Sequence, residues 1–384
     1  MIDSLKNKTV IRIIPGLIFC LIVMLVGIYG AHLIGELLLV TGVLPEGSSS
    51  PISGIFVTIL LGVAIRNTIG LKGLFMKGIG FSVKYALRAG IILLGLRLSL
   101  TEALKLGAWG LPLIVACISV GLFVTLYFTK KMNQSPRLGT LIATGTGICG
   151  ITAIMATAPV IKAKEDEISY AVANITIFGL LGMLFYPYLA NIFFAEDPIK
   201  AGLFLGTAIH DTAQVSGAAL IYNQMYHTPL VVDVATITKL TRNMFIIAVI
   251  PFVSYLFFRS NRKTEIAEGE AGQLPKWYKL FPVFILGFLF LSFMRTIGDV
   301  TVSSTGLAFG LFDPTVWKDF YSFWSSFGST YLLGLAMAGV GLSTNLKIFK
   351  GMGIKPFYIG MIAAFSVGAV SLILISIFGD LIVI

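Results

Sequence analysis

Two cationic residues lie three positions apart inside a long apolar stretch of the chain. Lys239 and Arg242 fall within residues 229–258, and a helix would place both on one face. Positive charge inside lipid is costly unless something compensates it. A bound anion would do so, and so would Asp211 or Asp233. The sequence leaves these two explanations open, and a third candidate for an anion contact or a buried ion pair is Arg88.

An adjacent histidine and aspartate interrupt a second apolar stretch, residues 199–223. Histidine titrates near neutral pH, so His210 with Asp211 could carry a coupling proton. Gln214 follows four residues after His210, a spacing that predicts one shared helical face. The alternative is a hydrogen-bonded pair that only seals the helix bundle.

Glycines and threonines crowd the middle of a third stretch, residues 138–162. Each glycine weakens a helix by about 1 kcal/mol relative to alanine, so this composition predicts a break near the membrane midplane. The N–H groups that begin the second half-helix would then attract an anion. Close helix packing is the alternative explanation. The candidate substrate-binding residues here are Thr146, Gly147, Cys149, Gly150 and Thr152.

Other chemistries find no support in the sequence. Gly145, Gly147 and Gly150 spell G-x-G-x-x-G, but no strand or βαβ unit surrounds them, so a dinucleotide site is rejected. The three cysteines have no metal-ligand or disulfide spacing. We expect no cofactor, no metal and no nucleic-acid partner.

The elements that hold these residues must lie in a membrane. Of 384 residues, 57% are hydrophobic and only 12% are charged, which predicts an all-α integral membrane protein. About eleven transmembrane helices are expected. They cover residues 13–40, 51–70, 77–97, 107–128, 138–162, 168–193, 199–223, 229–258, 279–297, 321–346 and 356–383.

Lysine and arginine gather in alternate loops, which predicts the topology. The N-terminus is expected inside and the C-terminus outside, in a bacterial-type plasma membrane. A hydrophilic cytoplasmic linker, residues 259–279, divides the chain into spans one to eight (1–258) and spans nine to eleven (280–384).

Internal similarity favours a repeat architecture, which is common in transporters. The pattern of residues 95–112 recurs at 339–356, seven spans later, which fits an inverted repeat. A second pair, at 145–148 and 206–209, would run parallel. Both pairs cannot belong to one simple repeat, and the sequence does not decide between them.

Together the motifs at 145–161, 206–215 and 239–242 resemble the sulfate exporter family, whose members are described as conserved hypothetical integral membrane proteins. The resemblance runs from about residue 52 to the end, with residues 299–319, which we expect to form an outer loop, as a departure. It implies kinship with the cation–proton antiporter and anion transporter superfamily. A core domain would move against a fixed panel. The motif residues would surround the site: Thr146, Cys149, Thr152, His210, Asp211, Gln214, Lys239 and Arg242.

The resulting hypothesis is a secondary active transporter of a small anion such as sulfate, sulfite or a sulfonate. A proton, or sodium bound by freed carbonyls near Gly147, would drive it by alternating access. A homodimer is left open. The rivals are an organic-acid or cation transporter of the same fold, an intramembrane enzyme using His210 and Asp211 with Cys149, and a channel.

Overall fold

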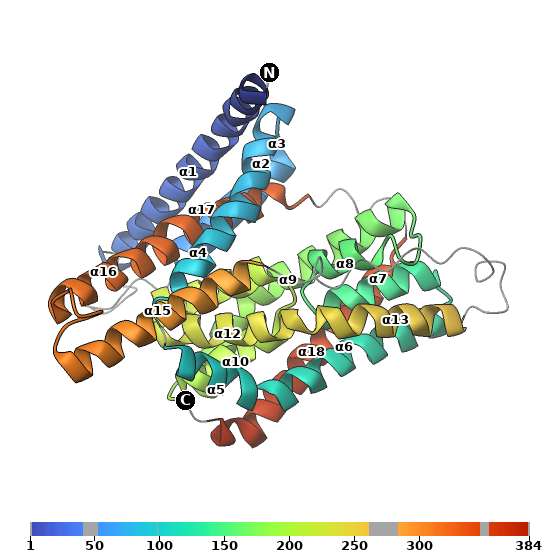
Figure 1. Ribbon diagram of the computed structural model, residues 1–384. Helices are drawn as coiled ribbons and strands as arrows, with labels where there is room; N and C mark the ends of the chain where they lie inside the picture. Colours follow the sequence, from blue (N-terminus) through green and yellow to red (C-terminus); the bar gives the residue numbers. More distant parts are fainter. Residues whose placement is uncertain (1, 41–52, 98, 261–282, 346–352, 383–384) are drawn as a thin grey trace. The chain divides into compact units, whose positions relative to one another are not determined.

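The protein is built almost entirely of helices (Figure 1). A computed structural model describes residues 2–40, 53–97, 99–260, 283–345 and 353–382. Up to residue 157 the helices are α1 (Ile2–Val40), α2 (Gly54–Thr68), α3 (Gly73–Phe81), the π-helical η1 (Ser82–Ala86), α4 (Leu87–Leu94), α5 (Leu100–Trp109), α6 (Leu111–Lys131), α7 (Pro136–Gly147) and α8 (Ile151–Thr157). Next come α9 (Glu165–Phe194), α10 (Pro198–Ala208), α11 (Thr212–Tyr226), α12 (Leu230–Met244) and α13 (Ile246–Ser260). The last are α15 (Phe284–Thr305), α16 (Pro314–Phe327), the π-helical η2 (Gly328–Leu332), α17 (Leu333–Ser343), α18 (Lys355–Phe378) and the 3-10 turn η4 (Gly379–Leu381).

Fewer helices are long enough to cross a membrane than the eleven expected. Among the described residues, six helices qualify by length and composition, or seven if α12 and α13, bent by 45°, form one span. The physical reason is interruption: the predicted spans 138–162 and 199–223 are each cut into two shorter helices. The span 77–97 contains the π-helical turn η1. Eleven spans, the topology and the linker 259–279 stay predictions, and most of that linker lies outside the described residues.

The contacts divide the chain into two compact units, each assembled from separate segments. Unit 1 contains residues 1–104, 219–233 and 284–345, and unit 2 contains residues 105–218, 234–283 and 346–384. The units are therefore interleaved along the sequence, whereas the predicted division at residues 259–279 follows chain order.

In unit 1, α1 packs against α2, α3 and α17, and the buried helix α17 also packs against α2. Glycine lets α1 and α3 approach closely, since a Cβ on Gly16 would lie 2.6 Å from the Cα of Gly78. Two further contacts are reciprocal: α4 packs on η2, and α17 packs on η1. This exchange is what an inverted repeat of 95–112 and 339–356 would produce. The repeat itself stays a prediction, and part of its second copy is outside the described ranges.

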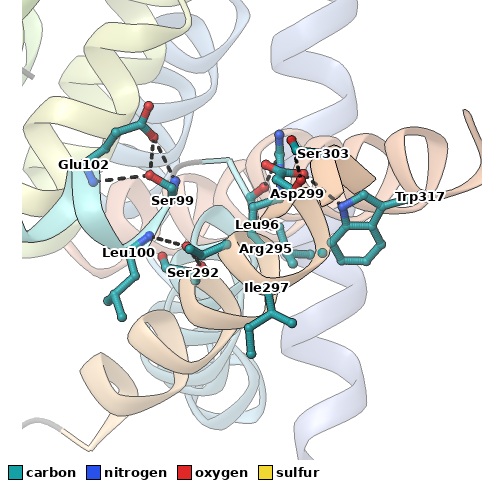
Figure 2. A network of polar contacts seen from close by, with 12 residues as sticks. Leu96, Ser99, Leu100, Glu102, Ser292, Arg295, Ile297, Asp299, Ser303 and Trp317 are labelled. Atoms are coloured by element: carbon teal, nitrogen blue, oxygen red, sulfur yellow. Dashed lines mark hydrogen bonds and ion pairs between the residues drawn. The ribbon is translucent and has the colours of Figure 1, made fainter. Parts of the chain in front are cut away.

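A polar network in unit 1 holds the segment between α4 and α5 against α15 (Figure 2). Ser292 Oγ donates to the Gly95 carbonyl at 2.9 Å, and Arg295 Nη1 donates to the Leu96 carbonyl at 3.0 Å. The Leu100 N–H donates to Thr296 Oγ1 at 2.8 Å. These three α15 side chains have i, i+3, i+4 spacing and so share one face. They satisfy backbone groups that the interrupted helix leaves unpaired.

The prediction that residues 299–319 form a loop is wrong. Helix α15 continues to Thr305 and α16 begins at Pro314, so the connection is only residues 306–313. Asp299 is a helical residue that accepts hydrogen bonds from Arg295 Nε at 2.7 Å and Trp317 Nε1 at 3.1 Å.

Unit 2 carries both motif-bearing segments. Helix α6 packs on α7 and α18, and α10 packs on α9 and α18. Apolar residues of α6, α7, α8, α9 and α13 form two buried clusters. Local signals start the two interrupted segments: Ser135 caps α7 before Pro136, and Asp197 Oδ1 accepts from the N–H groups of Ile199 and Lys200 at 3.0 Å before α10.

Candidate functional site

The predicted interruption in residues 138–162 is present. Helix α7 ends at Gly147 and α8 begins at Ile151. Gly150 forms the corner with φ +72° and ψ −125°, a conformation that favours glycine. Cys149 is buried beside it, whereas Thr152, in the first turn of α8, is exposed. The residues of the break itself, 148–150, are thus buried, and exposure begins with the first turn of α8.

A second interruption separates α10 from α11. Helix α10 ends at Ala208 and α11 begins at Thr212, so His210 and Asp211 lie in the break. The predicted shared face of His210 and Gln214 is therefore wrong, because no helix joins them. Gln214 instead donates through Nε2 to the Thr176 carbonyl of α9 at 2.9 Å.

The ammonium group of Lys239 bridges the two breaks. Its Nζ donates to the carbonyl oxygens of Ile148 at 3.0 Å and Ile209 at 3.1 Å, and also to that of His210. Lysine has three N–H donors and each has an acceptor here. Lys239 is only 1% exposed, so its charge is compensated by backbone dipoles inside the unit.

Arg242, one turn further along α12, makes the matching contacts with 0% exposure. Its Nε donates to the Gly147 carbonyl at 3.1 Å, Nη2 to Thr146 at 2.7 Å and Nη1 to Thr207 at 2.5 Å. These carbonyls end α7 and α10, where helix dipoles are negative. The three bonds use three of the five N–H groups of a guanidinium.

Asp211 lies at the opposite, positive ends of the half-helices. Its Oδ1 accepts from the Ala213 N–H at 2.9 Å, which caps α11. A Cβ on Gly150 would lie 2.8 Å from Asp211 Oδ2, so the carboxylate also faces the α7–α8 break. Two cations and one carboxylate thus lie at the breaks, which leaves one formal positive charge.

Several buried polar atoms around the breaks have no hydrogen-bond partner among the described residues. They are Thr146 Oγ1, His210 Nδ1, Gln214 Oε1, Thr238 Oγ1 and Asn243 Oδ1. An unpaired buried polar group costs roughly 1–3 kcal/mol, so such groups mark places for water or ligand. Asn243 was not predicted as a site residue. Its Nδ2 donates to Thr212 Oγ1 at 3.1 Å. The sequence signal that could have identified it is a polar residue next to Arg242 in the same apolar stretch.

Two other charged residues have different surroundings from those expected. Asp233 forms an ion pair with Arg97 at 3.0 Å within unit 1, so Asp233 is not the group that compensates Lys239 and Arg242. Arg88 is an exposed residue of unit 1 whose guanidinium lies over the Phe284 ring at 5.7 Å. The other candidate site residues belong to unit 2. Across the described ranges, no group of three His, Cys, Asp or Glu side chains could hold a metal ion.

The long apolar helices and the charged breaks define the class: a multi-pass helical membrane protein of bacterial type. The chain belongs to the family described as Conserved hypothetical protein 698, whose model matches residues 15–360.

The chain is similar to bacterial relatives over nearly its whole length. It is 32% identical to a UPF0324 membrane protein of Streptococcus agalactiae over 366 residues, which cover 95% of this chain and 98% of the relative. It is also 32% identical over 330 residues to a UPF0324 membrane protein of Fusobacterium nucleatum, covering 86% and 91% of the two chains. The expected resemblance to conserved hypothetical membrane proteins is confirmed, and these descriptions name no substrate.

Proposed function

We propose that the protein is a secondary active transporter of a small anion. The observation that carries this proposal is the pair of buried cations, Lys239 and Arg242, at two helix breaks within one unit. Interrupted helices at membrane depth commonly form the substrate sites of transporters. Because Asp211 offsets only one of the two cations, an anion would complete the charge balance.

Arg242 is the proposed direct contact of the anion. All three N–H groups of Lys239 donate to carbonyls. Arg242 has five N–H groups, of which three donate to carbonyls and two are left for an anion. A planar guanidinium suits an oxyanion. The sulfate, sulfite or sulfonate class, and the wider superfamily mechanism, come from the sequence resemblance and remain part of this proposal.

His210 and Asp211 are the proposed proton-coupling residues. Both lie in the α10–α11 break, and His210 Nδ1 has no hydrogen-bond partner among the described residues. A carboxylate at the positive helix ends competes with a visiting anion, so protonation of Asp211 would favour anion binding. Uptake of a proton and an anion at the same place would couple the two fluxes.

The test replaces Arg242 by lysine, which retains the charge and removes the spare donors. We expect sulfate or sulfite to raise the melting temperature of the wild type, and Arg242→Lys to need at least about tenfold more anion for the same shift, roughly 1.4 kcal/mol. The matched control is Arg259→Lys, at an exposed residue of unit 2. If no oxyanion stabilises the wild type, the rival organic-acid or cation transporter is favoured.

Flux in proteoliposomes tests the coupling and the remaining alternatives. Anion flux should respond to an imposed pH gradient, and His210→Gln should weaken that response. Flux that ignores the gradient would reject His210 as a coupling residue. Cys149→Ala should retain flux, since the proposed protein is not an enzyme that uses this thiol. Conduction far above carrier turnover would instead indicate a channel.

A further inference from the structure

Three carbonyl oxygens from two separate helix breaks converge on one atom in unit 2. They belong to Ile148 in the α7–α8 break, and to Ile209 and His210 in the α10–α11 break. Backbone carbonyls freed at interrupted helices form the usual binding site of a coupling cation in membrane transporters. Here the atom at their centre is Lys239 Nζ.

We propose that Lys239 fills a monovalent-cation site with its own ammonium group, so that the protein needs no sodium or other mobile metal cation at the breaks. The ammonium is fixed to α12 and lies within hydrogen-bond distance of all three oxygens. It therefore holds the ends of both breaks together permanently, as a bound ion would hold them reversibly.

Burial and neighbouring charge support this assignment. Lys239 is 1% exposed and has a second full cation, Arg242, one turn away on α12. Arg242 occupies the carbonyls of Thr146, Gly147 and Thr207. A mobile cation approaching these six carbonyls would meet two fixed positive charges in a region of low dielectric constant, where repulsion is strong. Sodium coupling through carbonyls near Gly147 is thus disfavoured.

This inference deepens the proposed function, because it narrows the coupling ion to the proton. Its physical content is separate, however, because it concerns cation binding and not the anion. If Lys239 only fills space with its aliphatic stem, Lys239→Ala should have no cation-binding site. If its ammonium group occupies an ion site, Lys239→Ala should expose the three carbonyls as an empty cation-binding site.

The experiment measures the melting temperature of Lys239→Ala in ammonium, methylammonium, potassium, sodium or choline chloride at constant ionic strength. We expect one or more of the small cations to raise it saturably by roughly 3 °C, while choline, which is too large, does not. The control is Lys84→Ala, at an exposed lysine. For the wild type and for this control, the melting temperature should not depend on which of the five salts is present. A Lys239→Ala protein that is indifferent to every small cation would overturn the inference.

A measurement on the wild type keeps the inference testable if Lys239→Ala does not fold. Saturable stabilisation of the wild type by sodium over choline, or anion flux that requires sodium, would contradict it, whereas equal behaviour in both salts supports it. The anion responses are scored separately. Cation rescue of Lys239→Ala without any anion effect on the wild type would sustain this inference and reject the proposed function.

Discussion

Gly150 shows how a single residue controls the geometry of the site. Its φ of +72° lies in a region that residues with side chains rarely adopt, and a Cβ there would lie 2.8 Å from Asp211 Oδ2. The corner lets the Ile148 carbonyl face Lys239 and the last α7 carbonyls face Arg242, while Gly150 faces the Asp211 carboxylate. One glycine therefore separates the cationic and anionic sides of the break.

We predict that Gly150→Ala lowers the free energy of unfolding by about 1–3 kcal/mol, because the added methyl group strains the backbone and crowds Asp211. Thermal unfolding in detergent measures this. Gly80→Ala is the control, since a Cβ there meets nothing within 4 Å and glycine is unfavourable inside α3. Equal stability of Gly150→Ala and wild type would mean that the corner is not strained.

At this scale the sequence predicted the positions but not the partners. Clustered glycines predicted the α7–α8 break because helix propensity is a local property. The hydrogen bonds of Lys239 and Arg242 to six carbonyls could not be predicted, since every residue has a carbonyl and only the fold determines which ones lose their helical partner. The sequence offered Asp211, Asp233 or a bound anion, and the backbone supplied the contacts instead.

Among the elements, α15 holds an interrupted segment in the way that α12 does in the other unit. Ser292, Arg295 and Thr296 bind the backbone between Gly95 and Leu100 (Figure 2). Arg295 also pairs with Asp299, and its guanidinium lies 3.4 Å from the centre of the Tyr321 ring. Each break thus has a neighbouring helix that satisfies its freed carbonyls.

We predict that Arg295→Lys destabilises the protein by about 1–3 kcal/mol, because lysine cannot serve the Leu96 carbonyl, Asp299 and the Tyr321 ring together. The melting temperature of the purified protein measures the loss. Arg259→Lys makes the same change at an exposed position and should leave it unchanged. If both variants melt alike, the α15 network contributes little stability.

Element boundaries were harder to predict than element type. Helices were expected throughout, but η1 and η2 add π-helical turns before α4 and α17 that hydrophobicity does not signal. For the same reason the helical residues 299–305 and 314–319 were predicted as part of a loop. Amino-acid composition predicts whether a segment lies in lipid or in water better than it predicts the segment's backbone conformation.

For the whole molecule, membrane insertion was predictable from composition, whereas the two units were not. Hydrophobicity and charge depend on sequence alone. Units 1 and 2 are each assembled from segments up to hundreds of residues apart, so only contacts reveal them. The inside and outside loops remain predictions from lysine and arginine placement.

We predict that a membrane-impermeant maleimide added to intact cells labels His227→Cys and spares Asn133→Cys. Both positions are exposed and have positive φ, of 53°, so the two variants are well matched. His227 lies in a predicted outer loop and Asn133 in a predicted inner loop. The wild type is a low-background control, because Cys20, Cys117 and Cys149 are all buried. Labelling of Asn133→Cys from outside would reverse the topology.

The leftover positive charge at the breaks has an electrical consequence. With Asp211 ionised, the empty breaks carry this charge, and each elementary charge that crosses the membrane field gains or loses about 2.3 kcal/mol per 100 mV. Under the proposed coupling, a proton and a monovalent anion would bind together, so the loaded breaks would carry the same single positive charge as the empty ones. A complete cycle would then move no net charge, and the pH gradient, not the membrane voltage, would drive it.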